Sequence, residues 1–245
     1  MSSEPRLLLV LPLFLGVLAA SLVLRAQDEA ASAAEIPAAA TPPNGSLVAH
    51  VKRGRVVAVR SEPNGRVLTS LGSRTEFGSE QALSVVRERR RRWLGVTTPH
   101  LPNGRLGWID ARSRALRYSR APVELEIDLS RRQLLVRRSH QVLRRVRVSI
   151  GRAGSPTPTG RFAVTDKLPG AGYSSVYGCC VLALSGTQPN LLPGWSGGNR
   201  LALHGTRDQR SVGGRASAGC LHARDGDLRH LMNVVPLGAP VRIHA

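Results

Sequence analysis

Short runs of alternating apolar and polar residues, separated by turn residues, make up most of the chain beyond residue 45. The run at 142–150, VLRRVRVSI, has the two-residue period of a half-buried strand. Proline, asparagine and glycine mark turns at 63–65 and 103–104. Helical periodicity is confined to 79–92 and 225–232. The pattern therefore predicts a mainly β protein with one or two short helices.

The N-terminal segment predicts that the folded part of the protein is located outside the cytoplasm. Residues 7–24 contain no charged side chain and are bordered by Arg6 and Arg25, which fits either an export signal or a membrane anchor within residues 1–26. The sequence around Arg25 is a poor cleavage site, which favours an uncleaved anchor with the membrane as a partner. Residues 27–45 are rich in Ala, Pro and Ser and predict a flexible linker. Both alternatives place the folded part in the extracytoplasmic envelope, secreted or anchored.

The strand pattern divides the folded part of the chain. Residues 46–112 predict short strands with tight turns, and the segments RSEPNG and GRLGWI resemble those of a bacterial SH3-like β-barrel. Residues 113–122 are interpreted as a linker, and 123–245 as a second domain with its own core. Trp93 and Trp108 are expected either to line a wall-binding groove or, as is commoner in so small a barrel, to fill its core.

The charge of the chain is strongly positive. The formal net charge is +19, and all but two of the 35 basic residues are arginines, with the densest cluster at 87–92. A guanidinium group binds phosphate or carboxylate in a fork. A charge of this size often indicates a nucleic-acid-binding protein. Export from the cytoplasm argues against nucleic acid as the partner. We therefore expect anionic envelope polymers as partners, with a merely solvated charged face as the alternative, and no nucleic acid.

One cysteine and one histidine stand in a pattern that favours nucleophilic catalysis. His204 is followed by Gly205, and Cys220 is preceded by Gly219. A free thiol with a pKa of roughly 8.5 is only a few per cent ionised at neutral pH, so a cysteine nucleophile needs a base beside it. A glycine before the cysteine permits a sharp turn in which N–H groups converge on an oxyanion. A cysteine and a histidine that only pack are the alternative.

The other two cysteines, Cys179 and Cys180, are adjacent. Neighbouring residues of a strand point to opposite faces, so a disulfide between them would be strained, and we expect both to be packing residues. A regulatory disulfide from one of them to Cys220 is the alternative. No Cys-x-x-Cys or His-x-x-x-His spacing indicates zinc, and neither a metal nor a cofactor is expected.

Three separated motifs carry a resemblance to a known family. They are VSIGRAGSPTPTGRF at 148–162, the pair His204-Gly205 with the later SAGC at 217–220, and a closing strand near 234–243. In this order they resemble the L,D-transpeptidase (YkuD-type) catalytic domain over about half of the chain. The resemblance implies a YkuD-type β-sandwich or barrel with one or two short helices. Two positions depart from the family's usual residues: Ala218 replaces a histidine, and His222 an arginine or asparagine.

The resemblance also implies roles for particular residues. Cys220 would attack a carbonyl of a peptidoglycan stem peptide, His204 would be its base, Gly205 would orient the imidazole, and Gly219 would supply an oxyanion N–H together with Cys220. Further residues implied in substrate binding are Ser217, Thr206, His222, Tyr173 and Trp195. For His222, an ordinary exposed residue is an equal alternative. Cross-linking of stem peptides through a thioester is the expected function. The alternatives are an L,D-carboxypeptidase that uses water as acceptor and a non-catalytic wall-binding protein.

Overall fold

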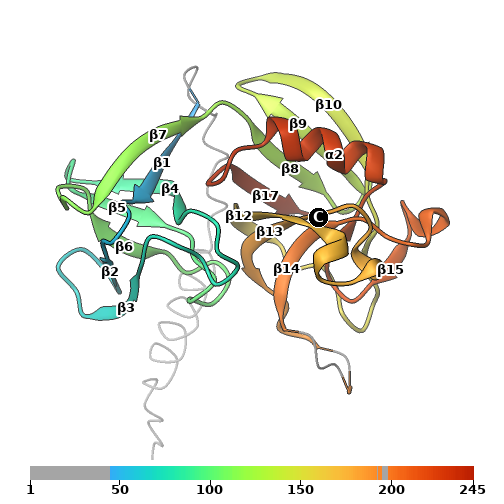
Figure 1. Ribbon diagram of the computed structural model, residues 1–245, viewed down its shortest axis with the longest axis horizontal. Coiled ribbons are helices and arrows are strands. Elements are labelled where there is room, and N and C mark those ends of the chain that lie inside the picture. Colours follow the sequence, from blue (N-terminus) through green and yellow to red (C-terminus); the bar gives the residue numbers. More distant parts are fainter. Residues whose placement is uncertain (1–44, 192, 195–197) are drawn as a thin grey trace, which may run out of the picture. The chain divides into compact units, whose positions relative to one another are not determined.

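Strands dominate the structure of this protein (Figure 1). The computed structural model describes residues 45–191, 193–194 and 198–245, all of which belong to one compact unit, Ala40–Ala245. The prediction of a mainly β fold is confirmed. The predicted anchor at 7–24 and nearly all of the linker at 27–45 lie outside the described residues. No helix in the described part of the chain is both long enough and apolar enough to span a bilayer.

The first sheet has seven strands in the order β3-β2-β6-β5-β4-β1-β7. Its alternating residues supply a separate core, as in β2, where Val57 and Val59 are buried and Ala58 and Arg60 are not. Trp93 and Trp108 are also buried, and the guanidinium groups of Arg92 and Arg89 lie over their rings, so neither ring lines an open groove. The strands are β1 (Ser46–Val51), β2 (Val57–Arg60), β3 (Val67–Leu71), β4 (Ala82–Arg89), β5 (Trp93–Val96), β6 (Gly107–Asp110) and β7 (Leu116–Ala121).

Two local predictions for this region are wrong. The helical period at 79–92 is overridden, because β4 pairs with β1 on one side and with β5 on the other. The segment 113–122, interpreted as a linker, contains β7, which pairs with all six residues of β1. Only the two terminal residues of β7 are buried, so its interior has the polar composition of a linker. The resemblance to SH3-like barrels stays a prediction.

The second sheet has eight strands in the order β10-β9-β8-β17-β12-β13-β14-β16. Its strands are β8 (Glu124–Asp128), β9 (Gln133–Arg138), β10 (Gln141–Arg147), β12 (Gly160–Pro169), β13 (Cys180–Thr187), β14 (Arg200–His204), β16 (Leu221–His222) and β17 (Pro240–His244), and a small parallel pair is formed by β11 (Ile150–Gly151) and β15 (Arg215–Ser217). Helix α2 (Asp225–Val234) packs against β13 through Leu228 and Leu231, which are fully buried. The predicted helix at 225–232 is confirmed. Three short 3-10 helices, η1 (Gly170–Gly172), η2 (Ser175–Tyr177) and η3 (Gln209–Ser211), lie in the connections.

Strand alternation separates a core face from a pocket face at the end of this sheet. Leu182, Leu184, Leu201, Leu203 and Leu221 are at most 1% exposed and belong to the core of the second sheet. The residues between them on β13 and β14 point to the opposite face, because side chains alternate along a strand. β16 runs parallel to β14 and extends this arrangement by one short strand. The sheet therefore presents a row of side chains to one pocket.

Cys179 and Cys180 are joined by a disulfide, with their Cα atoms 3.8 Å apart. The prediction that both are packing thiols is therefore wrong. The strand argument does not apply here, because β13 begins only at Cys180 and Cys179 lies in the turn before it, next to Gly178 with a φ of 60°. Cys220 is a free thiol, so the alternative of a disulfide from Cys179 or Cys180 to Cys220 is not found.

We expect the unfolded, non-reduced chain to bind one equivalent of iodoacetamide and the reduced chain three, because only Cys220 is free in the folded protein. Intact-mass analysis after alkylation in denaturant counts the labels, and Cys220→Ala provides the control with none and two. Three labels on the non-reduced wild-type chain would contradict the disulfide.

Candidate active site

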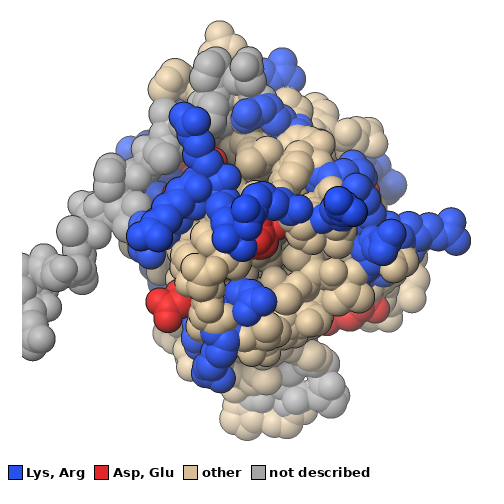
Figure 2. Space-filling model, turned by 90° about the vertical axis from the view of Figure 1, so that its left-hand side faces the viewer, with Lys and Arg blue, Asp and Glu red and all other residues tan. Residues whose placement is uncertain are grey.

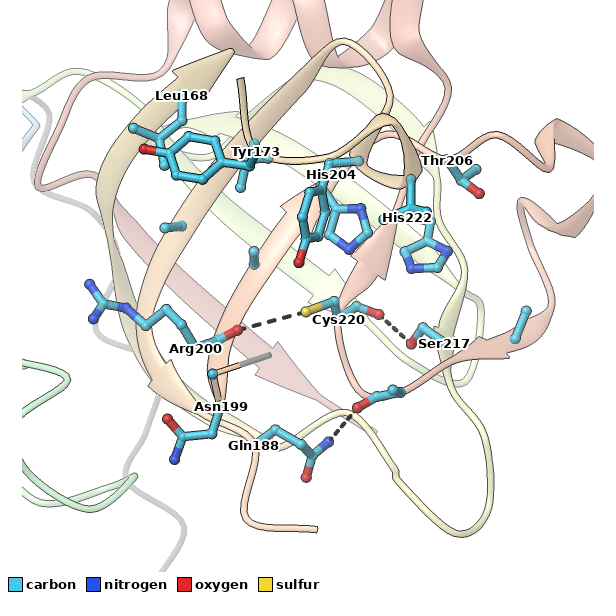
Figure 3. Close-up of a pocket in the computed structure, with 18 of the residues that line it drawn as sticks. Leu168, Tyr173, Gln188, Asn199, Arg200, His204, Thr206, Ser217, Cys220 and His222 are labelled. Atoms are coloured by element: carbon cyan, nitrogen blue, oxygen red, sulfur yellow. Dashed lines mark hydrogen bonds between the residues drawn. The ribbon is translucent and has the colours of Figure 1, made fainter. Parts of the chain in front are cut away.

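A pocket of about 440 Å³ opens on the face of β13, β14 and β16 opposite the core (Figure 3). It is lined by six residues expected at the site from the sequence, namely Tyr173, His204, Thr206, Ser217, Cys220 and His222. They come from three strands and the loops around them, and Figure 3 shows His204 and Cys220 on the same side of the pocket. Trp195 lies outside the described residues. The fold thus brings most of the expected side chains to one place.

Cys220 lies directly before β16, in an apolar part of the pocket. It packs against Leu168, Val181 and Ala202, and its Sγ lies 3.8 Å from the carbonyl oxygen of Arg200. Although the residue keeps some exposed surface, burial of the sulfur raises the pKa of the thiol to about 11, and a backbone hydrogen bond with Ala202 opposes this shift only in part. Cys220 is therefore a protonated thiol at neutral pH.

His204 ends β14 and is only 6% exposed. Its Nδ1 lies 2.6 Å from the carbonyl oxygen of Gly205. Because a carbonyl only accepts hydrogen bonds, Nδ1 carries the proton and Nε2 keeps its lone pair. Burial and, to a smaller extent, the nearby His222 lower the pKa of His204 to about 3, and the hydrogen bond to Gly205 opposes this shift only in part. The imidazole is thus a neutral base in one tautomer.

The backbone at Gly205 leaves no room for a side chain. A Cβ there would lie 2.7 Å from the carbonyl oxygen of Tyr177 and 2.5 Å from a carboxylate oxygen of Asp225. Gly205 N–H also donates to the carbonyl oxygen of Cys180, 3.2 Å away. This close packing explains why glycine follows His204, and it holds the carbonyl that fixes the tautomer.

The turn that carries Cys220 depends on Gly219. Its φ of 118° is a conformation that favours glycine, and a Cβ there would overlap the side chain of Gln188. Thr157 Oγ1 donates to the carbonyl oxygen of Gly219 over 2.8 Å. Ser217 Oγ accepts from Gly219 N–H at 3.0 Å and donates to the carbonyl oxygen of Cys220. The turn is therefore fixed from both sides before any substrate is bound.

These bonds bear on the expected oxyanion donors. Gly219 N–H is already engaged by Ser217, so it does not point freely into the pocket as the sequence pattern suggested. For the N–H of Cys220, the described residues supply no hydrogen-bond partner. Ser217 is 3% exposed and braces the turn. Cys220 N–H is consequently the stronger candidate for a donor to a developing oxyanion.

His222 lies beside His204 because β14 and β16 pair in parallel with these two residues in register. The ring centroids are 4.5 Å apart, and burial lowers the pKa of His222. Its Nδ1 is buried without a hydrogen-bond partner in the described part of the chain. This position in the pocket wall favours a role in the site over that of an ordinary exposed residue.

Three residues at the site were missed by the sequence analysis. The ring of Tyr177 packs edge-on against His204 with centroids 4.9 Å apart, and burial, with a smaller effect of charge on Cys220, raises its pKa. Arg200 places its carbonyl oxygen next to Cys220, and Phe77 enters the pocket from the first sheet. Tyr177 and Phe77 lie outside the three motifs, Phe77 in a loop of the first sheet, and Arg200 begins the strand that ends at His204 but is not a residue of the motif, so no local signal identified them.

Comparison with known proteins gives a family match over the second sheet. A family model described as the L,D-transpeptidase catalytic domain, YkuD, matches residues 122–243. The proteins named L,D-transpeptidase YkuD from Bacillus licheniformis and Bacillus subtilis are 25% and 24% identical over 122 and 123 residues. Each match covers 50% of this chain and 66% of the relative, so the chain matches just under two thirds of either relative.

A solved structure of an L,D-transpeptidase from Mycobacterium smegmatis is also similar to this chain. It is 18% identical, with a TM-score of 0.44, and the match covers 86% of this chain and 98% of that one. The structure of an Enterococcus faecium L,D-transpeptidase variant is 20% identical, with a TM-score of 0.40 and 50% of each chain covered.

We expect iodoacetamide to alkylate Cys220 in the folded protein at neutral pH about a hundredfold more slowly than in the unfolded, non-reduced chain. The reason is that a pKa near 11, against the ordinary 9.0, lowers the thiolate fraction by that factor. The rate should rise by about tenfold for each pH unit until the pH approaches that pKa. Intact-mass time courses measure both rates. A fast rate that is constant across the neutral range would instead indicate a preformed thiolate–imidazolium pair.

Proposed function

We propose that this chain, whose residues 122–243 belong to the YkuD family of L,D-transpeptidase catalytic domains, is a cysteine-dependent acyltransferase acting on peptidoglycan stem peptides. The observation that carries the proposal is the pocket in which free Cys220 and His204 in a single tautomer face the same space. This arrangement combines a nucleophile, a base and a backbone donor. Acyl transfer is the reaction class that uses all three.

The proposed reaction begins with two neutral groups. As the sulfur of Cys220 bonds to the carbonyl carbon between an L-centre and a D-residue, Nε2 of His204 takes the thiol proton. Cys220 N–H stabilises the oxyanion that forms. The C–N bond then breaks, the imidazolium returns its proton to the leaving amine, and a thioester remains. An amine of a second stem peptide attacks this thioester, loses its proton to His204, and leaves a free thiolate that recovers the proton.

The protonation states of the resting site support this order of events. A His204 pKa near 3 keeps the lone pair on Nε2 available throughout the neutral range. A Cys220 pKa near 11 keeps the sulfur protonated, and so unreactive towards small electrophiles, until a substrate occupies the pocket. The fixed tautomer means that no ring reorientation is needed. Proton transfer during attack is therefore favoured over a standing ion pair.

The other expected residues have supporting positions. Tyr173 and Thr206 lie in the pocket wall, and His222 adds a partly buried ring beside the base. We propose that these three contact the stem peptide, while Ser217 acts only on the turn. Ala218 leaves the turn geometry intact, because its carbonyl oxygen is held by Ser155 Oγ at 2.8 Å.

We expect the full chain to convert stem tetrapeptides into cross-linked products, and Cys220→Ala to form none, because the thioester cannot form without the sulfur. His204→Gln should lower kcat/KM by roughly a hundredfold or more, since it removes the base while keeping a side chain of similar size. Mass spectrometry of the products, with and without an acceptor amine, measures both.

The same experiment separates the alternatives. Shortened stem peptide without any cross-linked product would identify an L,D-carboxypeptidase. No thioester adduct and no product from the wild-type chain would contradict an enzyme and favour a wall-binding protein. Lys52→Ala, directly after β1 and outside the pocket, is the control variant and should retain full activity.

The charged surface supports a second part of the proposal, a location in the cell envelope. Residues 45–121 carry 16 Lys and Arg against five Asp and Glu, and Figure 2 shows Lys and Arg over much of one face with few acidic side chains. We propose that this face attracts anionic polymers of the envelope. The N-terminal segment, through which the membrane would be a partner, lies outside the described residues.

We expect the compact unit Ala40–Ala245, which leaves out the predicted anchor, to cosediment with vesicles rich in anionic lipid, and this binding to weaken steeply with added salt, because the exposed arginines at 87 and 89–91 are screened. Charge reversal at Arg87 and Arg89 should weaken it further, and the control is binding to neutral vesicles. If binding were equally strong to neutral vesicles and at high salt, electrostatic attraction would not be its cause.

A further inference from the structure

The loop between β3 and β4, residues 72–81, reaches from the first sheet to the pocket in the second sheet. Thr75 Oγ1 donates a hydrogen bond to Asp166, which is fully buried on β12. Glu76 pairs with Arg200 at the start of β14, with 2.7 Å between carboxylate and guanidinium. The connection between the sheets at this point is therefore made of polar bonds to two elements beside the pocket.

Phe77, at the tip of this loop, forms part of the pocket wall. Its ring packs edge-on against Tyr173 with centroids 6.0 Å apart. It also packs against the apolar cluster of Leu168, Val181 and Ala202 that contacts Cys220. A residue of the first sheet thus borders the same space as the candidate nucleophile.

Arg200 gives Phe77 a fixed support. The guanidinium lies 5.7 Å from the centroid of the Phe77 ring, and the side chain is 13% exposed. Its Nε donates to the carbonyl oxygen of Leu184 at 2.6 Å, and a second nitrogen donates to Thr165 Oγ1 at 3.1 Å. Because the guanidinium is held on several sides, Phe77 rests on a rigid base and not on a mobile side chain.

A second cavity of about 180 Å³ adjoins this wall. It shares Phe77, Gly198, Asn199 and Arg200 with the first pocket and continues to Pro99 and His100, which follow β5 of the first sheet. Thr187 also lines this cavity, and it is bonded to the first sheet's loop residue Asn103. The Asn103 side-chain amide donates to the Thr187 carbonyl at 2.6 Å and accepts from the Thr187 N–H at 2.9 Å. The two cavities therefore share a border formed by Phe77 and Arg200.

We propose that Phe77 is a specificity-determining residue of the substrate site, and that the first sheet supplies part of the surface that binds an extended peptide. This inference rests on the proposed function. The apolar pocket takes the peptide around the reacting carbonyl, with an aliphatic portion packed on the Phe77 ring. The rest of the peptide passes over Arg200 into the more polar second cavity. Small reagents that reach only Cys220 do not depend on Phe77.

The test compares a stem tetrapeptide with iodoacetamide on the full chain. Phe77→Ala should lower kcat/KM for the tetrapeptide by about tenfold, mainly through KM, because part of the apolar wall is lost. Phe77→Leu, which keeps an apolar side chain, should recover most of it, to within about threefold of wild type. The alkylation rate of Cys220 should not fall in Phe77→Ala or Phe77→Leu, because the thiol and its base are unchanged and a smaller side chain only opens the apolar cluster that both residues contact.

The matched control is Tyr118→Ala, which removes an aromatic side chain of the first sheet that is 42% exposed and does not line either cavity. It should leave both rates unchanged. Thermal unfolding verifies that the variants fold. If Phe77→Ala does not fold, Phe77→Trp replaces it, and its larger ring should lower kcat/KM by crowding the same wall.

Each outcome decides the inference. A loss confined to the tetrapeptide supports it. An unchanged kcat/KM, or a loss equal to that of Tyr118→Ala, overturns it and leaves the proposed function intact. An equal loss in the alkylation rate also overturns it, since Phe77 would then act only through the geometry of Cys220. If the wild-type chain does not react with the tetrapeptide at all, the proposed function fails, and this inference fails with it.

Discussion

The parallel pairing of β14 with β16 is the constraint on which the site depends. In this register Leu203 lies beside Leu221 and His204 beside His222. The two leucines are buried in the core, which holds the short β16 against the sheet. Because paired residues of parallel strands point to the same face, the same register directs both histidines into the pocket. Cys220 directly precedes β16, so core packing also positions the nucleophile.

Burial has opposite consequences for the two reacting groups, and both consequences favour neutral species. It raises the pKa of Cys220 and lowers that of His204, since removal from water disfavours a thiolate and an imidazolium alike. The hydrogen bond from Nδ1 to Gly205 then decides which nitrogen is the base. The apolar pocket thus keeps Cys220 as a protonated, unreactive thiol and His204 as a neutral imidazole with Nε2 unprotonated.

The first sheet is connected to the site through Arg200. This residue begins β14, its carbonyl oxygen contacts Cys220 Sγ, and its guanidinium pairs with Glu76 from the first sheet. Its desolvated side chain is compensated by two carboxylates, because it also lies 3.6 Å from Asp166. The start of the strand that ends at His204 is therefore held partly by residues of another sheet.

Local pattern was sufficient where the chemistry depends on neighbouring residues. Two-residue alternation predicted the β fold, and the motifs around His204 and Cys220 identified the family. These motifs can be recognised in the sequence because Gly205 and Gly219 stand where the structure has no room for a side chain. Local pattern failed where pairing with a distant strand decided the conformation, as in 79–92, where β4 pairs with β1 and the segment forms strand and not helix. It failed also for Cys179 and Cys180, where a turn before β13 allows a disulfide that strand geometry argued against.

The sequence by itself determined the strand-rich fold of residues 123–245, its family, and the identity of the candidate nucleophile and base. Only the tertiary structure decided that His222 lies beside His204, that Ser217 occupies the N–H of Gly219, and that Phe77 enters the pocket. The physical reason is that residue spacing fixes local backbone geometry, whereas burial, tautomer and pocket walls depend on strand register and on contacts between residues far apart in the chain.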